Sequence, residues 1–241
     1  MAQEPTAERF VAELETHRSD EDRTAMLRYF KTGAGEYGEG DLFLGIRMGT
    51  LFEVSKGYAD MPVTELEKLL ESPVHEVRAG ALSIMNKAAM AKRTSPERRA
   101  ELYELYLRRH DRINNWDLVD VACRYVIGVY LEDKPRDVLY RLAASANIWE
   151  RRTAIVSTWW FIRSGDLDDA MALSEVLVND EQDLIHKAVG WMLRYAGDKD
   201  PARLRDFLDR HAPTMPRTML RYAIEKLSPE LRKHYLGLRS R

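Results

Sequence analysis

Apolar residues recur at spacings of three and four along most of this chain, which is the pattern of amphipathic α-helices. The spacing is clear at Leu66, Leu69 and Leu70, and again over residues 155–162. Sustained alternation of apolar and polar residues is missing, and so are the Asn-Gly and Asp-Gly turns typical of β-hairpins. The pattern predicts an all-α protein whose helices, of about 10–18 residues, are separated by short turns.

Proline, glycine and aspartate mark the boundaries between the predicted helices. These turn signals fall at 71–73, 94–96, 133–135, 164–166, 197–201 and 211–213. The longest irregular stretch is 32–41, TGAGEYGEGD, which has four glycines and no apolar periodicity. A loop of this length is uncommon inside a compact domain and is often functional.

A faint internal repeat organises these helices. Each of the segments 75–85, 148–158, 184–194 and 218–227 places one basic residue before a run of small apolar residues. Those residues are Arg78, Arg152, Lys187 and Arg221, separated by 74, 35 and 34 positions, and segment 115–126 fills the unit missing from the first gap.

Periods of about 30–47 residues built from helix pairs are typical of HEAT and armadillo solenoids. We therefore expect residues 1–241 to form a single HEAT-like α-solenoid domain. Equivalent positions of successive repeats would line one concave surface, so the four basic residues would form a stripe along a groove. The alternative is that these charges lie on ordinary solvated helix faces.

Composition narrows the class of protein. A chain of 241 residues that is 45% hydrophobic and 32% charged is typical of folded globular proteins. No stretch approaches the roughly 18–20 uncharged apolar residues of a membrane span. The single cysteine, Cys123, excludes an internal disulfide and a multi-cysteine zinc site. The acidic, amphipathic N-terminus is unlike a signal or transit peptide, so we expect a cytoplasmic protein with no membrane partner.

The formal net charge of −2 argues against a globally basic nucleic-acid binder, although it says nothing about local patches. Two segments are candidates for chemistry, 115–120 (NWDLVD) and 147–152 (NIWERR). Each begins with an asparagine suited to cap a helix, followed by an acid in the first turn. Trp116 lies four residues before Asp120, so the two side chains share a helix face.

The tryptophans also have a competing explanation, because tryptophans in helical proteins are mostly packed into the core. For Trp116 and Trp191 this alternative stays open. Trp149, Trp159 and Trp160 lie inside helix-periodic apolar runs, and we expect them to be packing residues.

The candidate segments, in this order and spacing, resemble the AlkD family of DNA alkylation-repair glycosylases, HEAT-like solenoids that excise alkylated purines. The resemblance runs from about Tyr29 to residue 195. It rests on YFK at 29–31, FLGI at 43–46, WDLVD at 116–120, NIWERR at 147–152 and KAVGWMLR at 187–194.

The resemblance implies roles for individual residues. Asp120 would be the catalytic carboxylate, and Trp116 and Trp191 would be aromatic walls contacting the lesion nucleotide. Arg152 would hold backbone phosphate. Further candidates for DNA contact are Lys187, Arg78, Arg221 and Lys31. Asp117 lies in the first turn on another face, and we expect it chiefly to affect helix stability.

These residue types suit the implied reaction. A purine alkylated at N3 or N7 is cationic and leaves readily, and cleavage of its glycosidic bond gives the sugar oxocarbenium character. One carboxylate can stabilise that cation and align a water molecule. No second acid, metal or redox cofactor is then expected, and the partner would be double-stranded DNA containing alkylated purines, bound by a monomer.

The chain departs from the family pattern in two places. The family usually carries a proline and basic residues soon after the Leu-Gly-Ile stretch, where this chain reads RMGTLF at 47–52, and Asn115 replaces a second tryptophan of some members. Two other functions stay open: a DNA-binding paralogue without glycosylase activity, and a protein-binding HEAT scaffold.

Other kinds of active site find no support in the sequence. The six histidines form no HExxH motif or close pair, and the glycines of 32–41 lack the GxGxxG spacing. Cys123 lies in an apolar helical run, which favours a buried, inert thiol.

Overall fold

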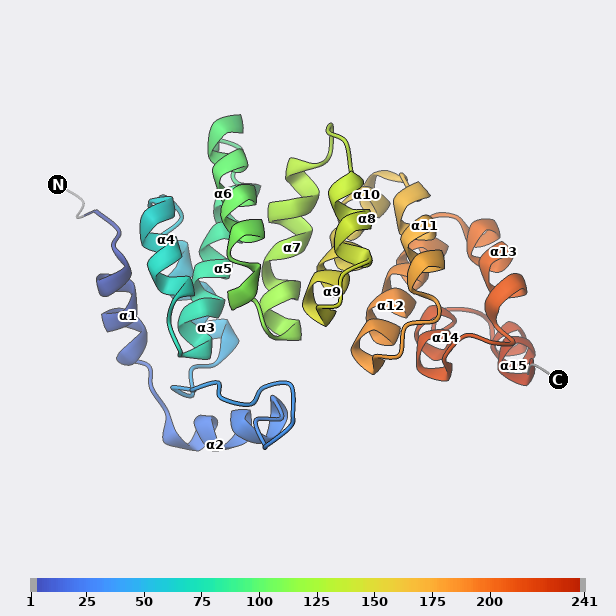
Figure 1. Cartoon of the computed structure of the whole chain (residues 1–241), viewed down its shortest axis with the longest axis horizontal. Coiled ribbons are helices and arrows are strands. Elements are labelled where there is room, and N and C mark those ends of the chain that lie inside the picture. Colours follow the sequence, from blue (N-terminus) through green and yellow to red (C-terminus); the bar gives the residue numbers. More distant parts are fainter. Residues whose placement is uncertain (1–3, 239–241) are drawn as a thin grey trace. The chain divides into compact units, whose positions relative to one another are not determined.

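The computed structural model describes residues 4–238, in which helices alternate with short turns (Figure 1). No β-strand forms within these residues, and the only extended pairing recorded there is an isolated bridge between Leu42 and Val74. The all-α class predicted from the apolar spacing is therefore confirmed. Among the same residues, no helix is long and apolar enough to cross a membrane.

The helices group into two compact units, one ending at Tyr130 and the other beginning at Leu131, where the sequence predicts a single domain. The helices of the first unit are α1 (Ala7–Glu15), α2 (Asp20–Tyr29), α3 (Met48–Lys56), α4 (Val63–Leu70), α5 (His75–Met90), α6 (Pro96–Arg108), a short 3-10 helix η1 (His110–Arg112) and α7 (Trp116–Tyr130).

Helix α5 is the centre of the first unit and packs against α3, α4, α6 and α7. Most of its residues are buried, and many are small, so neighbouring helices approach it closely. A methyl group at Gly80 would lie 2.4 Å from the ring of Phe10 in α1, which explains why glycine occupies this position.

The helices of the second unit are α8 (Asp137–Ala143), α9 (Ile148–Ser157), α10 (Trp159–Ser164), α11 (Asp168–Leu177), α12 (Asp183–Lys199), α13 (Pro201–His211), α14 (Arg217–Ala223) and α15 (Pro229–Gly237). Helix α12 is its centre and contacts α9, α11, α13 and α14. At Gly190 a methyl group would lie 2.5 Å from the carbonyl oxygen of Met219, so glycine lets α12 and α14 pack closely.

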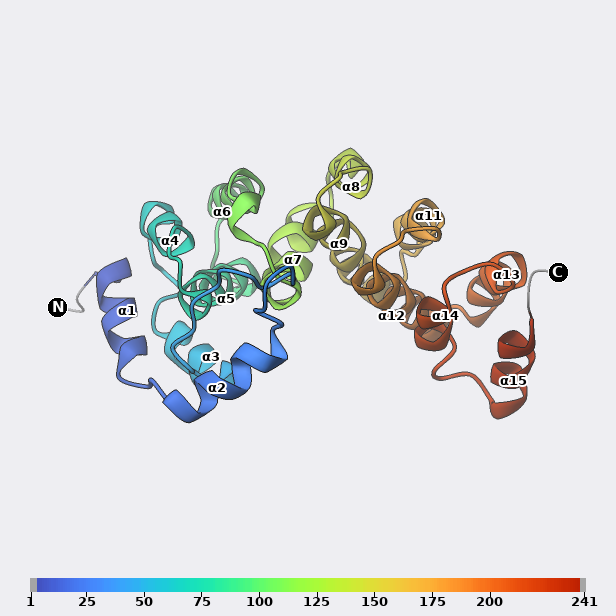
Figure 2. The ribbon, with the colours of Figure 1, turned by 60° about the horizontal axis from the view of Figure 1, so that its bottom comes forward.

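Helices that carry the sequence repeat pack side by side within each unit. In the first unit α5 lies against α7, and in the second unit α9, α12 and α14 follow one another (Figures 1 and 2). Helices α4 and α6 cover α5 in the first unit, and α11 and α13 cover α12 in the second. Each unit is therefore built from two layers of helices.

Several predicted boundaries are confirmed by the helix caps. Pro96 and Pro201 occupy the first turn of α6 and α13, after the N-caps Ser95 and Asp200. The side chain of Asn147 accepts a hydrogen bond from the backbone N–H of Trp149 at 2.9 Å, as expected for an N-cap. The irregular stretch predicted at 32–41 lies in the long connection between α2 and α3.

Candidate active site

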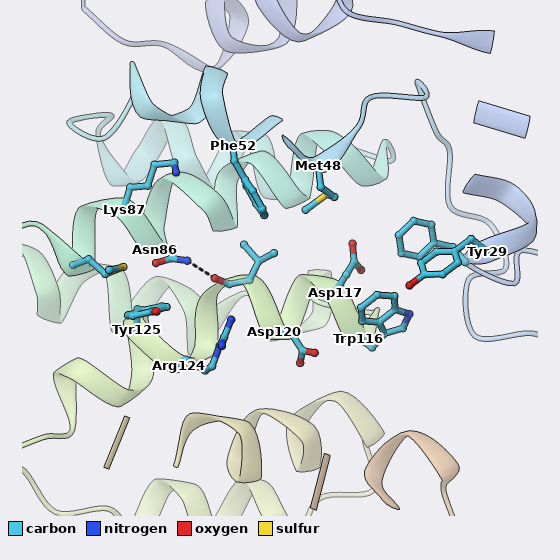
Figure 3. Close-up of a pocket in the computed structure, with 13 residues that line it drawn as sticks. Tyr29, Met48, Phe52, Asn86, Lys87, Trp116, Asp117, Asp120, Arg124 and Tyr125 are labelled. Atoms are coloured by element: carbon cyan, nitrogen blue, oxygen red, sulfur yellow. Dashed lines mark hydrogen bonds between the residues drawn. The ribbon is translucent and has the colours of Figure 1, made fainter. Parts of the chain in front are cut away.

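A cavity of about 530 Å³ opens beside α7 in the first unit (Figure 3). Its walls come from α2, α3, α5 and α7 and are largely aromatic or aliphatic. The lining residues are Tyr29, Phe30, Met48, Phe52, Asn86, Lys87, Met90, Trp116, Asp117, Asp120, Val121, Arg124 and Tyr125. Both residues that the sequence places on one helix face, Trp116 and Asp120, line this cavity.

Helix α7 supplies a row of side chains at intervals of four residues, Trp116, Asp120 and Arg124. Residues at this spacing stack along one side of a helix, about 6 Å apart along its axis. Asp120 and Arg124 lie on the same side of α7, whereas Asp117 projects toward Met48 (Figure 3). Arg124 was missed in the sequence, although its spacing from Asp120 was a usable signal.

Trp116 is half-buried and is held by two neighbours from the end of α2. The ring of Phe30 stacks on it at 5.8 Å with an interplanar angle of 22°. Tyr29, which is 64% exposed, meets it edge to face at 5.8 Å. Trp116 is also hydrogen-bonded to Tyr37 of the glycine-rich stretch. The indole N–H donates this bond, because it is the only polar group of a tryptophan side chain. Trp116 is therefore packed on one side while still lining the cavity.

Near this cavity, the buried His75 joins two carboxylates. The ring nitrogen Nδ1 of His75 lies 3.0 Å from Oδ2 of Asp41, and its Nε2 lies 2.8 Å from Oδ2 of Asp117. Burial alone would lower the pKa of His75, but the charge and hydrogen bonds of Asp117 and Asp41 outweigh it and raise the pKa to about 9. The histidine is therefore an imidazolium at neutral pH, donating to both carboxylates.

This network corrects the role expected for Asp117. Asp117 does lie in the first turn of α7, but the residue is only 6% exposed and its side chain pairs with His75 across 42 positions of sequence. Asp117 therefore holds α7 to the N-terminus of α5 and does more than stabilise its own helix. Nothing in the spacing of segment 115–120 indicates that partner.

Arg78 belongs to the same buried cluster. It is 2% exposed, and its guanidinium donates to Oδ1 of Asp41 at 2.6 Å and to the carbonyl oxygen of Ser72 at 2.9 Å. The hydrogen bond of His75 and the charge of Arg78 outweigh burial and lower the pKa of Asp41. The expectation that Arg78 is an exposed cation along a groove is therefore wrong, because its charge is neutralised inside the first unit.

The segment that departs from the family pattern contributes to both the surface and the cavity. On the surface, Arg47 forms a bidentate ion pair with Asp22 of α2, with N–O distances of 2.8 and 3.0 Å. Met48 and Phe52 line the cavity across from α7 (Figure 3). The RMGTLF stretch thus presents apolar side chains to the site at the positions following Arg47.

The remaining predicted site residues differ in exposure. Arg152 in α9 is 5% exposed and donates to the carbonyl oxygen of Leu184 at 2.7 Å, so it is buried in the second unit and is not an exposed member of a basic stripe. Lys187 in α12 forms an ion pair with Asp183 at 2.7 Å. Arg221 in α14 and Lys31 after α2 are exposed.

The other tryptophans divide into two groups. Trp149 is buried in α9, as predicted for a packing residue. Trp159 and Trp160 are half-buried, and the guanidinium carbon of Arg163 lies 4.3 Å from the ring centre of Trp160. Trp191 in α12 is half-buried beside Tyr195, with ring centres 5.9 Å apart. The core-packing alternative for Trp191 therefore stays open.

Cofactor chemistry has few candidate ligands here. Within residues 4–238, no group of three or more histidine, cysteine, aspartate or glutamate side chains is placed to hold a metal ion. Cys123 is fully buried, as its apolar surroundings predict. The charged side chains that line the cavity are Asp117, Asp120, Lys87 and Arg124.

These features define an all-helical protein whose first unit has a cavity lined by aromatic side chains and by the carboxylates of Asp117 and Asp120. The family model for DNA alkylation repair enzymes matches residues 10–227, and the chain belongs to that family. This confirms the resemblance found in the sequence. No curated protein sequence is similar enough to this chain to count as a match.

A solved structure shares the fold. It is described as a predicted DNA alkylation repair enzyme from Enterococcus faecalis, and it superposes with a TM-score of 0.68 at 18% sequence identity. The match covers 88% of this chain and 98% of the other. At this identity the similarity shows the fold alone.

Proposed function

We propose that this protein is a DNA glycosylase that hydrolyses the N-glycosidic bond of cationic N3- or N7-alkylated purines in duplex DNA. The observation that carries the proposal is the placement of Asp120 one helical turn from Trp116, both lining one cavity in a member of a DNA alkylation repair family. An acid and an aromatic face are the two features that a cationic leaving base requires.

In the proposed reaction, the bond between C1′ of the deoxyribose and the base nitrogen breaks, and its electron pair neutralises the positive charge of the base. The sugar gains oxocarbenium character, which the carboxylate of Asp120 stabilises. A water molecule then adds its oxygen to C1′ and gives up a proton, which Asp120 can accept as general base. The products are a neutral alkylated base and an abasic site, and no metal or redox cofactor takes part.

The aromatic wall would favour a cationic nucleotide. An indole or phenol face attracts a positive charge by about 0.5–2 kcal/mol, depending on how far both are removed from water. Trp116 and the exposed Tyr29 present such faces beside Asp120. The resemblance gives Trp191 a similar role. A neutral, undamaged purine would lack this attraction and would also be a poor leaving group.

We further propose that the chain is a monomeric HEAT-like solenoid that holds the phosphate backbone in a basic concave groove. Lys31 and Arg221 are exposed cations and Lys187 is half-buried, so these three are the candidates for phosphate contact in this groove, whereas Arg152 is buried like Arg78. Contacts of this kind make affinity fall steeply with salt. The proposed place of action is the cytoplasm, on nucleoid DNA.

The test is release of free base from methylated duplex DNA by the purified protein. Chromatography with mass detection should show 3-methyladenine or 7-methylguanine above a control without enzyme, and Asp120→Asn should abolish most of the release. Salt-sensitive DNA binding without base release would contradict the glycosylase and favour the non-catalytic DNA-binding paralogue. Neither binding nor release would favour the protein scaffold.

A further inference from the structure

Three segments of the first unit meet at His75: the start of α5, which carries it, the glycine-rich stretch 32–41, and the first turn of α7. Its imidazole is 1% exposed on the side chain and bridges Asp41, at the end of the glycine-rich stretch, to Asp117, in the first turn of α7. Each of the two segments also carries a group at the cavity: Tyr37 on the glycine-rich stretch and Trp116 on α7 are hydrogen-bonded to one another. The histidine therefore joins the two segments that hold Trp116.

Aromatic packing extends the same connection. The His75 ring lies 4.7 Å from Phe43 and 4.8 Å from Phe30, and Phe30 also stacks on Trp116 at 5.8 Å. Two sets of contacts therefore connect the imidazole to Trp116. One runs through Asp117, which is the next residue after Trp116 in α7, and the other runs through the ring of Phe30.

The charge balance of the cluster depends on one proton. The charged groups facing His75 are Asp41 from the glycine-rich stretch, Asp117 from α7 and, through Asp41, Arg78 from α5 itself. With an imidazolium, two cations balance two carboxylates. With a neutral ring, one buried carboxylate loses its charge partner and one hydrogen bond, because a neutral imidazole has a single N–H. An uncompensated buried charge is strongly unfavourable, so the first turn of α7 would move.

We propose that His75 is a positioning residue whose imidazolium, bound to Asp41 and Asp117, fixes the first turn of α7 and thereby sets Trp116 and Asp120 for reaction. This inference rests on the proposed glycosylase activity for its kinetic consequence, but the geometric link from His75 to Trp116 stands independently of it. The role belongs to a residue that never touches the substrate.

The sign of the pH dependence follows from the raised pKa. Because the pKa of His75 in the folded protein is about 9, the arrangement is complete at neutral pH and is lost as the pH rises through 9. The excision rate should fall about tenfold between pH 8 and pH 10, since only about a tenth of the imidazole stays protonated one unit above its pKa. Asp117→Asn removes one of the two carboxylates but keeps an oxygen that can accept from Nε2.

The first experiment is an NMR titration of the unmodified protein, which needs no activity. The ¹⁵N signals of His75, identified by their loss in His75→Gln, should titrate near pH 9. The indole N–H signal of Trp116, identified with Trp116→Phe, should shift with the same midpoint, while that of Trp160 stays in place. Titration of His75 near its ordinary value of about 6.5, or a Trp116 signal that does not follow it, would overturn the proposal.

The second experiment compares single-turnover excision rates from pH 6 to pH 10 for the unmodified protein and Asp117→Asn. The ratio of the two rates at each pH cancels any ionisation of the substrate. We expect the rate of Asp117→Asn, divided by that of the unmodified protein, to fall as the pH rises, because losing one carboxylate lowers the pKa of His75 by about 1–3 units. Asp137→Asn, an exposed first-turn acid of α8, is the matched control and should give a constant ratio.

The outcomes separate the two proposals. If the unmodified protein releases no base at any pH, the glycosylase fails, and the NMR titration still decides the role of His75. If base is released but the Asp117→Asn ratio is independent of pH, the glycosylase stands and the positioning role is refuted.

Discussion

Oε1 of Glu76 lies 2.8 Å from the backbone nitrogen of Gly45, and the same carboxylate accepts hydrogen bonds from the backbone N–H groups of Leu44 and Ile46. Glu76 is a buried residue of α5, so one charged side chain anchors the connection between α2 and α3. Gly45 has φ +82°, a conformation that glycine adopts at little cost. This anchor places Phe43 against His75 and leads the chain into the cavity-lining helix α3.

We predict that Glu76→Gln destabilises the protein by about 1–3 kcal/mol, because a neutral amide oxygen is a weaker acceptor and its NH₂ group would face backbone donors. Urea denaturation followed by circular dichroism measures this loss. Glu39→Gln is a matched control, since Glu39 also accepts from a backbone N–H, that of Gly35 at 2.8 Å, but is exposed. Equal losses for the two variants would show that the buried anchor has no special weight.

We predict that Asp120→Asn lowers the excision rate about 10²–10³-fold, because it removes the charge that stabilises the oxocarbenium-like sugar while keeping the side-chain shape. DNA affinity should hold or rise slightly, since a negative charge near the phosphates is lost. Single-turnover assays and fluorescence anisotropy measure the two quantities. Asp117→Asn is unsuitable as an inert control because Asp117 is bound to His75, so exposed Asp137→Asn takes that place. Unchanged excision by Asp120→Asn would remove Asp120 from the catalytic role.

The aromatic wall should contribute less than the carboxylate. Trp116→Ala, Tyr29→Ala and Trp191→Ala should each slow excision by about 2–30-fold, which corresponds to losing one cation–π contact of 0.5–2 kcal/mol. Trp116→Phe keeps a ring but loses the N–H that reaches Tyr37, so it should fall between Trp116→Ala and the unmodified protein. If Trp191→Ala lowers thermal stability and leaves the rate unchanged, the core-packing explanation of Trp191 is the correct one.

The sequence predicts those features that depend on spacing along one helix. Trp116 and Asp120 share a face because residues four positions apart are separated by about one helical turn. Asn147 caps α9 because its side chain accepts a hydrogen bond from the backbone of the first turn of that helix. These contacts are local. Helix boundaries at Pro96 and Pro201 follow from the same local chemistry.

Features that depend on which distant residues pack against a helix could not be predicted from spacing along that helix. Arg78 was expected to be exposed, but its partner Asp41 lies 37 positions earlier in the chain. Arg152 is buried, and its guanidinium donates to the carbonyl oxygen of Leu184 in the first turn of α12, 32 positions later. Arg78 and Arg152 occupy matching places in the sequence repeat, but such places in a degenerate repeat meet different neighbours.

Buried and exposed cations should behave differently when removed. We predict that DNA affinity falls steeply with salt, and that Arg221→Ala and Lys31→Ala each weaken binding and lower the salt slope by about 1, with the fold intact, because both residues are exposed. Arg152→Ala should instead destabilise the fold by about 1–3 kcal/mol, because the residue is buried and its loss leaves the carbonyl of Leu184 without this donor. Anisotropy titrations at several salt concentrations, paired with melting curves, separate the two effects. Arg152→Lys is the conservative comparison: it retains a charge but not the planar guanidinium, so it should recover only part of the lost stability. Equal melting temperatures for Arg152→Ala and Arg221→Ala would contradict the structural role of Arg152, and salt-independent affinity would contradict phosphate contact by the chain as a whole.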